Sequence, residues 1–226
     1  MDMDKDTRGI FITATGTDVG KTYISSLLLK LLHQSGVNCG YYKPAMSGVC
    51  SEYPSDVQIV QNVANLLSEK CSVSYSFEEA VSPHLAASRQ GVNISLDKII
   101  ADYSKCSEKV DYLVVEGAGG ITCPFNLGNQ QLLLSDVIKA LNLGILIVSD
   151  AGLGTLNSTI LTCEYAKSQG LKIKGVILNN FDADNFIHQD NLVQVKKLSG
   201  VEVIATVSKG ATELGIDSEI LKGIFN

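Results

Sequence analysis

The chain has 226 residues and a formal net charge of −6. Its 45% apolar and 19% charged residues are typical of a globular chain that buries a core, which excludes general disorder. The length excludes a large multi-domain machine, and the acidic balance argues against a protein that binds a nucleic-acid backbone.

The sequence alternates expected strands and helices. In chain order the expected elements are strand Ile10–Thr15, helix Lys21–Gln34, strand Gly40–Lys43, helix Asp56–Leu67, helix Ser95–Ser107, strand Tyr112–Val115, helix Leu134–Leu141, strand Ile145–Ser149, helix Thr155–Gln169, strand Gly175–Leu178, helix Asn191–Ser199 and strand Val201–Ala205. Most strands are continuously apolar, which is typical of strands buried on both faces. We therefore predict a single α/β domain over residues 1–226, a doubly wound and mostly parallel sheet with flanking helices. The segment Cys71–Gln90 is the least regular, and we expect it to carry a substrate loop.

The six cysteines, at positions 39, 50, 71, 106, 123 and 163, form no CxxC pair, and there are only three histidines. This argues against a structural zinc site and against a disulfide-dense secreted fold, so we expect reduced thiols. The chain shows neither the layout of a signal peptide nor an apolar run of membrane-spanning length. We expect a cytoplasmic protein in which residues 1–8 are flexible.

A loop typical of phosphate binding follows the first strand. It reads Ala14-Thr15-Gly16-Thr17-Asp18-Val19-Gly20-Lys21-Thr22 and ends in Gly-Lys-Thr at a helix start. Backbone N–H groups at such a position bind phosphate, a lysine reaches the β- and γ-phosphates, and a threonine hydroxyl binds Mg²⁺. The strict pattern requires a glycine where Thr15 stands, so a loop that merely caps the helix is the alternative. The position between a buried strand and a leucine-rich helix favours the P-loop NTPase type.

Charged side chains follow the next two buried strands. Lys43 ends a strand in Lys-Pro-Ala-Met-Ser-Gly, where Pro44 is expected to end the strand, and Glu116 follows a strand directly before Gly117-Ala118-Gly119-Gly120. Ser55-Asp56 begins a helix, and either residue is a plausible N-cap. The alternatives without a ligand are that Lys43 is an exposed lysine before a turn and that Glu116 forms a salt bridge at the end of its strand. Carboxylates beside a phosphate loop favour Mg²⁺.

Two further strand ends carry candidate ligand groups. Asn179 and Asn180 end the strand that begins at Gly175, and they suit either an Asx turn or hydrogen bonds to adenine. The segment Gly152–Asn157 opens a helix whose N–H groups could hold a carboxylate.

These motifs together resemble the dethiobiotin synthetase family over about residues 10–180. The phosphate loop resembles the family pattern G-T-D-T-x-V-G-K-T, with Ala14 and Gly16 in place of its first glycine and its aspartate. The strings K-P-x-x-S-G, S-D, V-E-G-A-G-G, L-G-x-x-N and S-P-H also match. His84 of the last string is expected to be structural.

The resemblance implies a role for each matched residue. Lys43, Lys21 and Thr17 would be catalytic. The nucleotide and its metal would be bound by Asp18, Val19, Gly20, Lys21, Thr22, Tyr23, Asp56, Glu116, Gly117, Ala118, Gly119, Asn179 and Asn180, with Thr22, Asp56 and Glu116 on Mg²⁺. The diamine would be bound by Ser47, Gly154, Thr155, Leu156 and Asn157, the last four across a homodimer interface. A loosely aligned base-contacting segment would fall at Ser208–Gly210.

The implied reaction is closure of a ureido ring, in which 7,8-diaminononanoate, CO₂ and ATP give dethiobiotin, ADP and phosphate. The small molecules, Mg²⁺ and a second copy of the chain would be its partners, with no nucleic acid and no membrane. A deviant-Walker switch ATPase is an alternative, although residues 14–18 lack the second loop lysine that such proteins need. A catalytically impaired nucleotide-binding homologue is another. An amidotransferase of the cobyrinate type would need a glutaminase domain, for which 226 residues leave no room.

Overall fold

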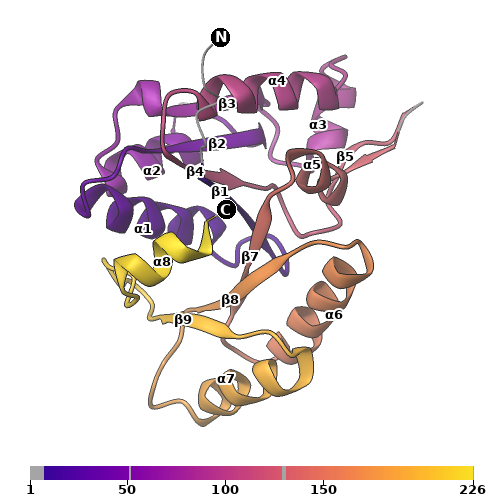
Figure 1. Cartoon of the computed structure of the whole chain (residues 1–226). Helices are drawn as coiled ribbons and strands as arrows, with labels where there is room; N and C mark the ends of the chain where they lie inside the picture. The colour runs from indigo at the N-terminus through magenta and orange to yellow at the C-terminus, as the bar shows by residue number, and fades with distance from the viewer. Residues whose placement is uncertain (1–7, 51, 129–130, 226) are drawn as a thin grey trace.

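The computed structural model describes residues 8–50, 52–128 and 131–225. Within these ranges, seven strands form one sheet, and all its registered neighbours are parallel. In sheet order they are β3 (Cys71–Ser76), β2 (Cys39–Met46), β4 (Tyr112–Glu116), β1 (Arg8–Ala14), β7 (Gly144–Asp150), β8 (Ile173–Asn179) and β9 (Val203–Val207). After β1 the chain forms β2 and β3 on one side, returns to insert β4 next to β1, and then adds β7, β8 and β9 on the other side (Figure 1), which confirms the doubly wound α/β class.

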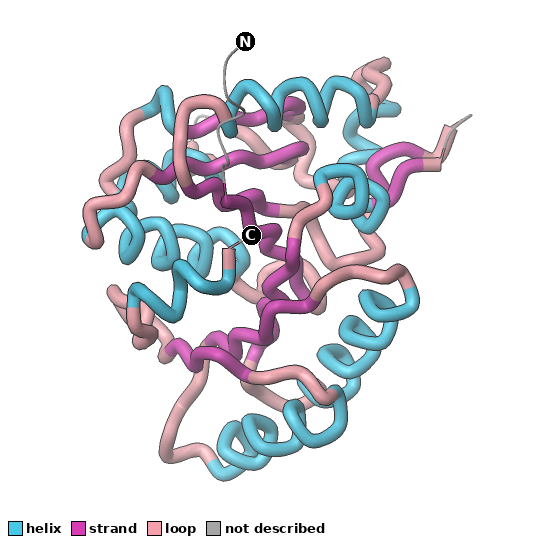
Figure 2. Tube along the Cα trace, viewed as in Figure 1, coloured by secondary structure: helices cyan, strands magenta, loops and turns pink. Residues whose placement is uncertain are grey.

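Helices cover both faces of the sheet (Figure 2). One face packs against α1 (Lys21–Gln34), α2 (Asp56–Ala64) and α8 (Ser218–Ile224). The other packs against α3 (Pro83–Arg89), α4 (Leu96–Ser107), α5 (Leu134–Leu141), α6 (Thr155–Ser168) and α7 (Phe186–Ser199). A short 3₁₀ helix, Ser68–Lys70, precedes β3, and the strands β5 (Pro124–Asn126) and β6 (Leu132–Leu133) form a small antiparallel pair.

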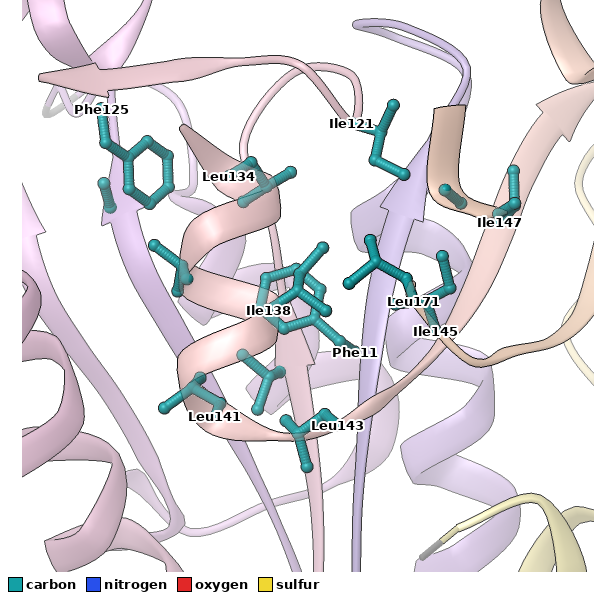
Figure 3. Packing of buried hydrophobic residues seen from close by; sticks show 14 of the residues in the cluster. Phe11, Ile121, Phe125, Leu134, Ile138, Leu141, Leu143, Ile145, Ile147 and Leu171 are labelled. Carbon is teal, nitrogen blue, oxygen red and sulfur yellow. The ribbon is translucent and has the colours of Figure 1, made fainter. Parts of the chain in front are cut away.

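The central strand β1 shows why the strands are continuously apolar. Ile10 and Ile12 belong to the core under α1, whereas Phe11 belongs to the opposite core, and all three are fully buried. Figure 3 shows Ile138 of α5 beside Phe11 on this second face. Successive side chains of a strand point to opposite faces, so a strand covered on both sides has no position for solvent-facing residues.

The predicted helix Lys21–Gln34 is confirmed, and Gly36 and Gly170 lie just beyond the ends of α1 and α6 with φ values of 77° and 71°. The irregularity predicted for Cys71–Gln90 is wrong, because this segment contains β3 and α3. The strand β3 lies at the edge of the sheet and alternates serine with larger residues, so it lacks the apolar run of a central strand. The flexibility expected for residues 1–8 concerns residues outside the described ones except Arg8, which begins β1.

Other boundaries also differ from expectation. The strand β2 continues through Pro44 to Met46. β2 pairs with β4 only as far as Tyr42, and Pro44 is not among its registered pairs with β3. No strand pairing therefore needs an N–H group at position 44, and proline is tolerated there. The helix α7 begins at Phe186, five residues before the predicted start, because the Asn185 side chain accepts a hydrogen bond from the N–H of Ile187 and caps it. No helix in the described ranges is long and apolar enough to span a membrane.

Candidate active site

The loop between β1 and α1 has the backbone of a phosphate-binding turn. Asp18 and Gly20 have positive φ values of 60° and 98°, and Gly20 precedes α1 without any side-chain cap. A Cβ atom on Gly20 would lie 2.2 Å from Nδ2 of Asn179, so both conformation and space require glycine. The N–H groups at the start of α1 are therefore available to an anion.

The two departures from the common loop pattern are tolerated. Ala14 is the buried last residue of β1 and is not among the described residues with positive φ, so it needs no glycine conformation. A Cβ atom on Gly16 would have no atom within 4 Å, so a larger residue would fit there. The turn keeps its geometry without the usual glycine and aspartate.

Lys21 is held over this loop. Its Nζ donates a hydrogen bond of 2.9 Å to the carbonyl of Gly16, and the side chain is buried. Burial lowers the pKa of Lys21, and the nearby Lys43 ammonium lowers it further, while Glu116 acts in the opposite direction. An ammonium in such a place gains from an incoming anion such as a phosphate group.

Three oxygen-bearing side chains from separate elements meet beside the loop. The Oγ1 of Thr22 on α1 lies 3.1 Å from Oδ1 of Asp56 on α2 and 2.8 Å from Oε1 of Glu116 at the end of β4. Glu116 has no exposed surface. The structure thus brings together the three residues that the family resemblance implies for Mg²⁺.

The start of α2 shows that Ser55, and not Asp56, is the N-cap of this helix. The Oγ of Ser55 accepts a hydrogen bond from the N–H of Gln58, and the Gln58 side chain accepts one from the N–H of Ser55, which is a capping box. Because Ser55 caps the helix, the Asp56 carboxylate is free to face Thr22 and Lys43.

Lys43 forms ion pairs with both carboxylates. Its Nζ lies 2.5 Å from Oε1 of Glu116 and 2.7 Å from Oδ2 of Asp56, and only 4% of the residue is exposed. Burial alone would lower the pKa of Lys43, but the carboxylates of Glu116 and Asp56 outweigh it and raise the pKa. Lys43 therefore carries a positive charge at the carboxyl end of β2, next to the phosphate loop.

A cleft of about 710 Å³ opens over these groups. Of the predicted site residues, it is lined by Thr17, Asp18, Gly20, Lys21, Thr22, Tyr23, Lys43, Ser47, Asp56, Glu116, Ala118 and Gly119. The Oγ of Ser47 is buried there without a hydrogen-bond partner among the described residues, as expected of a hydroxyl that awaits a ligand.

Some lining residues were not singled out from the sequence, although four of them lie in the segment Cys71–Gln90, which was expected to carry a substrate loop. Ala80, Val81, Ser82 and Pro83 line the cleft from the loop before α3, and Cys123 lines it near Gly119. The Ser-Pro-His string was the available signal for the first group, and no motif marked Cys123. His84 pairs through Nδ1 with the Oγ of Ser82, 3.0 Å away, and is not among the lining residues.

The remaining predicted residues lie outside this lining. Nδ2 of Asn179 donates to the carbonyl of Val19 over 3.0 Å, and Nδ2 of Asn180 donates to Oδ2 of Asp150 over 2.7 Å. Gly117 is buried, and its N–H donates to the carbonyl of Ile12. The segments Gly154–Asn157 and Ser208–Gly210 do not line the cleft either. Asn179 is nevertheless tied to the loop, and its Oδ1 is buried without a partner among the described residues.

The oxygen cluster fits a magnesium ion. Mg²⁺ prefers oxygen ligands, and proteins commonly bind it through one or two carboxylates together with water and substrate phosphates. Thr22, Asp56 and Glu116 supply a hydroxyl and two carboxylates. The cluster has two acids only, and within the described ranges there is no group of three or more His, Cys, Asp or Glu residues that could hold a metal.

The sequence comparisons agree with this geometry. A family model described as an AAA domain matches residues 8–212. The ATP-dependent dethiobiotin synthetase BioD of Clostridium botulinum (strain Loch Maree) is 47% identical over 189 residues, which cover 81% of this chain and 83% of the relative. The protein of the same name from Brachyspira hyodysenteriae is 46% identical over 220 residues, which cover 96% and 99%.

Solved structures with the same fold are more distant. The MinC:MinD cell division protein complex of Aquifex aeolicus matches with a TM-score of 0.57 at 12% identity, covering 96% of this chain and 86% of that one. The MinD cell division protein of the same organism matches with a TM-score of 0.55 at 14% identity, covering 89% and 82%. At these identities the likeness shows the fold alone.

Proposed function

Because the chain belongs to the family of ATP-dependent dethiobiotin synthetases, we propose that it joins 7,8-diaminononanoate, CO₂ and ATP in the cytoplasm to give dethiobiotin, ADP and phosphate. Family membership makes it an ATP-dependent ligase of biotin synthesis, with ATP as co-substrate. The observation that carries the specific reaction is the buried ammonium of Lys43 between Asp56 and Glu116, beside the phosphate loop.

The loop residues bind and orient the triphosphate. Backbone N–H groups of the turn that contains Asp18, Val19 and Gly20 bind phosphate oxygens, and Lys21 moves from the Gly16 carbonyl to them. Thr17 lines the same cleft as Gly119, and its hydroxyl would donate to the γ-phosphate. Phosphoryl transfer depends mainly on such positioning and charge neutralisation.

Thr22, Asp56 and Glu116 would hold Mg²⁺. The ion would neutralise charge on the β- and γ-phosphate oxygens when bound. The protein would hold one hydroxyl and two carboxylates together at the carboxyl end of β4. The contacts of Thr22 with both acids support this role in binding Mg²⁺.

Lys43 would hold the carbamate beside the γ-phosphate. Two anions at contact distance in a low-dielectric site repel each other strongly, and a buried ammonium between them offsets that repulsion. A preorganised charge that acts on the developing negative charge favours the transition state over the bound substrates. Ser47, on the same side of the cleft, would bind the diamine through its unpartnered hydroxyl.

The reaction would proceed in three steps. One amine of the diamine forms a C–N bond to CO₂ and loses a proton, which gives the carbamate. A carbamate oxygen attacks the γ-phosphorus, and the bond to ADP breaks. The second amine then attacks the carbonyl carbon, closes the ring, loses a proton and expels phosphate.

The nucleotide base and the far end of the diamine need further groups. Asn179 and Asn180 would contact the base, Tyr23 would lie beside the nucleotide, and Ser208–Gly210 is a second candidate segment for the base. The start of α6, Gly154 to Asn157, would bind the substrate carboxylate in the partner subunit of a homodimer, which fits its position outside the cleft of its own chain.

Exposed apolar side chains support the homodimer. Leu153, directly before this segment, is 93% exposed, Phe186 at the start of α7 is 78% exposed, and Leu161 on α6 is also exposed. Light scattering at micromolar concentration is expected to give twice the chain mass. A monomer with full activity would overturn the dimer and with it the shared site.

An omission series tests the reaction. Phosphate release is measured with ATP, Mg²⁺, the vicinal diamine and dissolved CO₂, and then with each left out. We expect release only with the full set. Brisk hydrolysis without diamine and CO₂ would instead support a switch ATPase, and nucleotide binding without any release would support an impaired homologue.

A further inference from the structure

The two oxygens of the Glu116 carboxylate have different partners. Oε1 accepts hydrogen bonds from Nζ of Lys43 and Oγ1 of Thr22, over 2.5 and 2.8 Å. Oε2 accepts a hydrogen bond of 2.9 Å from the phenol of Tyr41. No motif marked Tyr41, and the hydrogen bonds found within the described ranges give Oε2 no other donor.

From this contact we infer that Tyr41 is a positioning residue that turns Oε1 of Glu116 into the site. Tyr41 and Lys43 are two residues apart on β2, so both side chains point to the same face of the sheet. The sheet register places Tyr41 opposite Val114, two residues before Glu116 on β4. One strand therefore supplies a donor to each oxygen of the same carboxylate.

Burial makes this contact specific. Tyr41 and Glu116 both have no exposed surface, so bulk water does not compete for Oε2. A buried carboxylate oxygen without a donor is costly, and rotation of the carboxylate about its terminal torsion would relieve that cost by moving Oε2 toward Lys43 or Thr22. A phenol offers an O–H donor and a carboxylate only accepts, so Tyr41 is the donor of this hydrogen bond.

The consequence concerns metal affinity, and in this respect the inference rests on the proposed Mg²⁺ site. Hydrogen-bond partners behind a metal ligand typically contribute about 10–100-fold to metal affinity, because they hold the ligand in its binding orientation. Loss of the Tyr41 hydroxyl should therefore weaken metal binding without removing any ligand.

The test compares two tyrosines. Tyr41→Phe is expected to raise the dissociation constant of Mn²⁺, measured by electron paramagnetic resonance with ADP present, by about tenfold or more. Tyr42→Phe is the matched control, because Tyr42 is its equally buried neighbour and its phenol contacts Ser74 and the carbonyl of Ile99 on the opposite face of the sheet. An effect of Tyr41→Phe below twofold, or an equal effect of Tyr42→Phe, would overturn the inference.

A double-mutant cycle separates this inference from the metal site itself. Glu116→Gln should weaken Mn²⁺ binding, and adding Tyr41→Phe to it should then change little, since Tyr41 acts only through Glu116. An undiminished effect of Tyr41→Phe in that background would overturn the positioning role alone. A Glu116→Gln variant that binds Mn²⁺ as the parent does would overturn the metal site and the inference together.

A crystal structure of the parent protein with ADP and Mn²⁺ gives a check that needs no variant. It should show one carboxylate oxygen of Glu116 on the metal side while the other accepts a hydrogen bond from the Tyr41 phenol. A Glu116 carboxylate that binds the metal without any contact to the Tyr41 phenol would overturn the inference.

Discussion

Nζ of Lys43 and Oε1 of Glu116, two buried groups, lie 2.5 Å apart, and Oδ2 of Asp56 is 2.7 Å from the same nitrogen. The two acids are also the proposed metal ligands. The buried ammonium of Lys43 thus contacts both proposed metal ligands. It also lies where an anionic substrate would meet the γ-phosphate.

Lys43→Gln should lower turnover far more than nucleotide affinity. Loss of one preorganised charge at a reacting oxyanion typically lowers kcat by about 10²–10³-fold, whereas the loop still binds ATP. Steady-state kinetics together with calorimetry of a non-hydrolysable ATP analogue measures both. The exposed Lys172→Gln should change neither quantity, and equal losses of turnover and affinity in Lys43→Gln would contradict the assignment.

Lys21→Ala should abolish turnover while the fold remains intact. Lys21 is buried over the loop with its Nζ on the Gly16 carbonyl, and no other ammonium lies in the loop to compensate the triphosphate charge. Calorimetry with the ATP analogue should show weakened binding, and circular dichroism should match the parent. Unchanged analogue affinity would show that the loop only caps α1.

Asp56→Asn should raise the Mg²⁺ concentration needed for half-maximal turnover. The change removes a charged ligand, so this Mg²⁺ concentration should rise by about tenfold or more. Loss of a residue that only hydrogen-bonds to a metal ligand already weakens metal affinity by about 10–100-fold. Asp97→Asn is the control, because Asp97 also lies in the first turn of a helix capped by serine but is exposed. An Mg²⁺ requirement equal to that of the parent would reduce Asp56 to an ion-pair partner of Lys43.

Tyr42 makes stability depend on pH in the alkaline range. Burial raises the pKa of Tyr42, so above about pH 10 the unfolded chain loses this proton while the folded chain keeps it. The unfolded state then binds fewer protons than the folded one, and the free energy of unfolding falls as pH rises. Tyr42→Phe should cost about 0.5–1.5 kcal/mol at neutral pH but lose stability less steeply above pH 10 in urea titrations. Parallel curves for parent and variant would refute this.

Strong local signals were enough to predict the centre of the fold. The continuously apolar strands around β1 and the loop that ends at Thr22 mark the sheet and the phosphate site with little dependence on the rest of the chain. The edge strand β3 was not predicted, because alternating serines interrupt the apolar run that marks a central strand. Ser72, Ser74 and Ser76 alternate with Cys71, Val73 and Tyr75, and this period of two was the signal that could have revealed it.

Contacts between distant elements could not be predicted in this way. Tyr41 looks like any core residue of an apolar strand, and its bond to Glu116 depends on the register that pairs Tyr41 with Val114. The role of Asp56 was likewise ambiguous, because an acid at the start of a helix suits both capping and ligand binding. The structure excludes only the capping role, because Ser55 and Gln58 form the capping box while the Asp56 carboxylate faces Thr22, and ligand binding by Asp56 stays a prediction.

The fate of the carbon of CO₂ tests the central claim most directly. The purified protein is incubated with ATP, Mg²⁺, the vicinal diamine and ¹³C-labelled CO₂, and the product is analysed by mass spectrometry while phosphate is counted. If the buried ammonium of Lys43 holds a carbamate for phosphorylation, one labelled carbon should enter a ureido product for each phosphate released. Phosphate released without incorporation of the label would contradict the account.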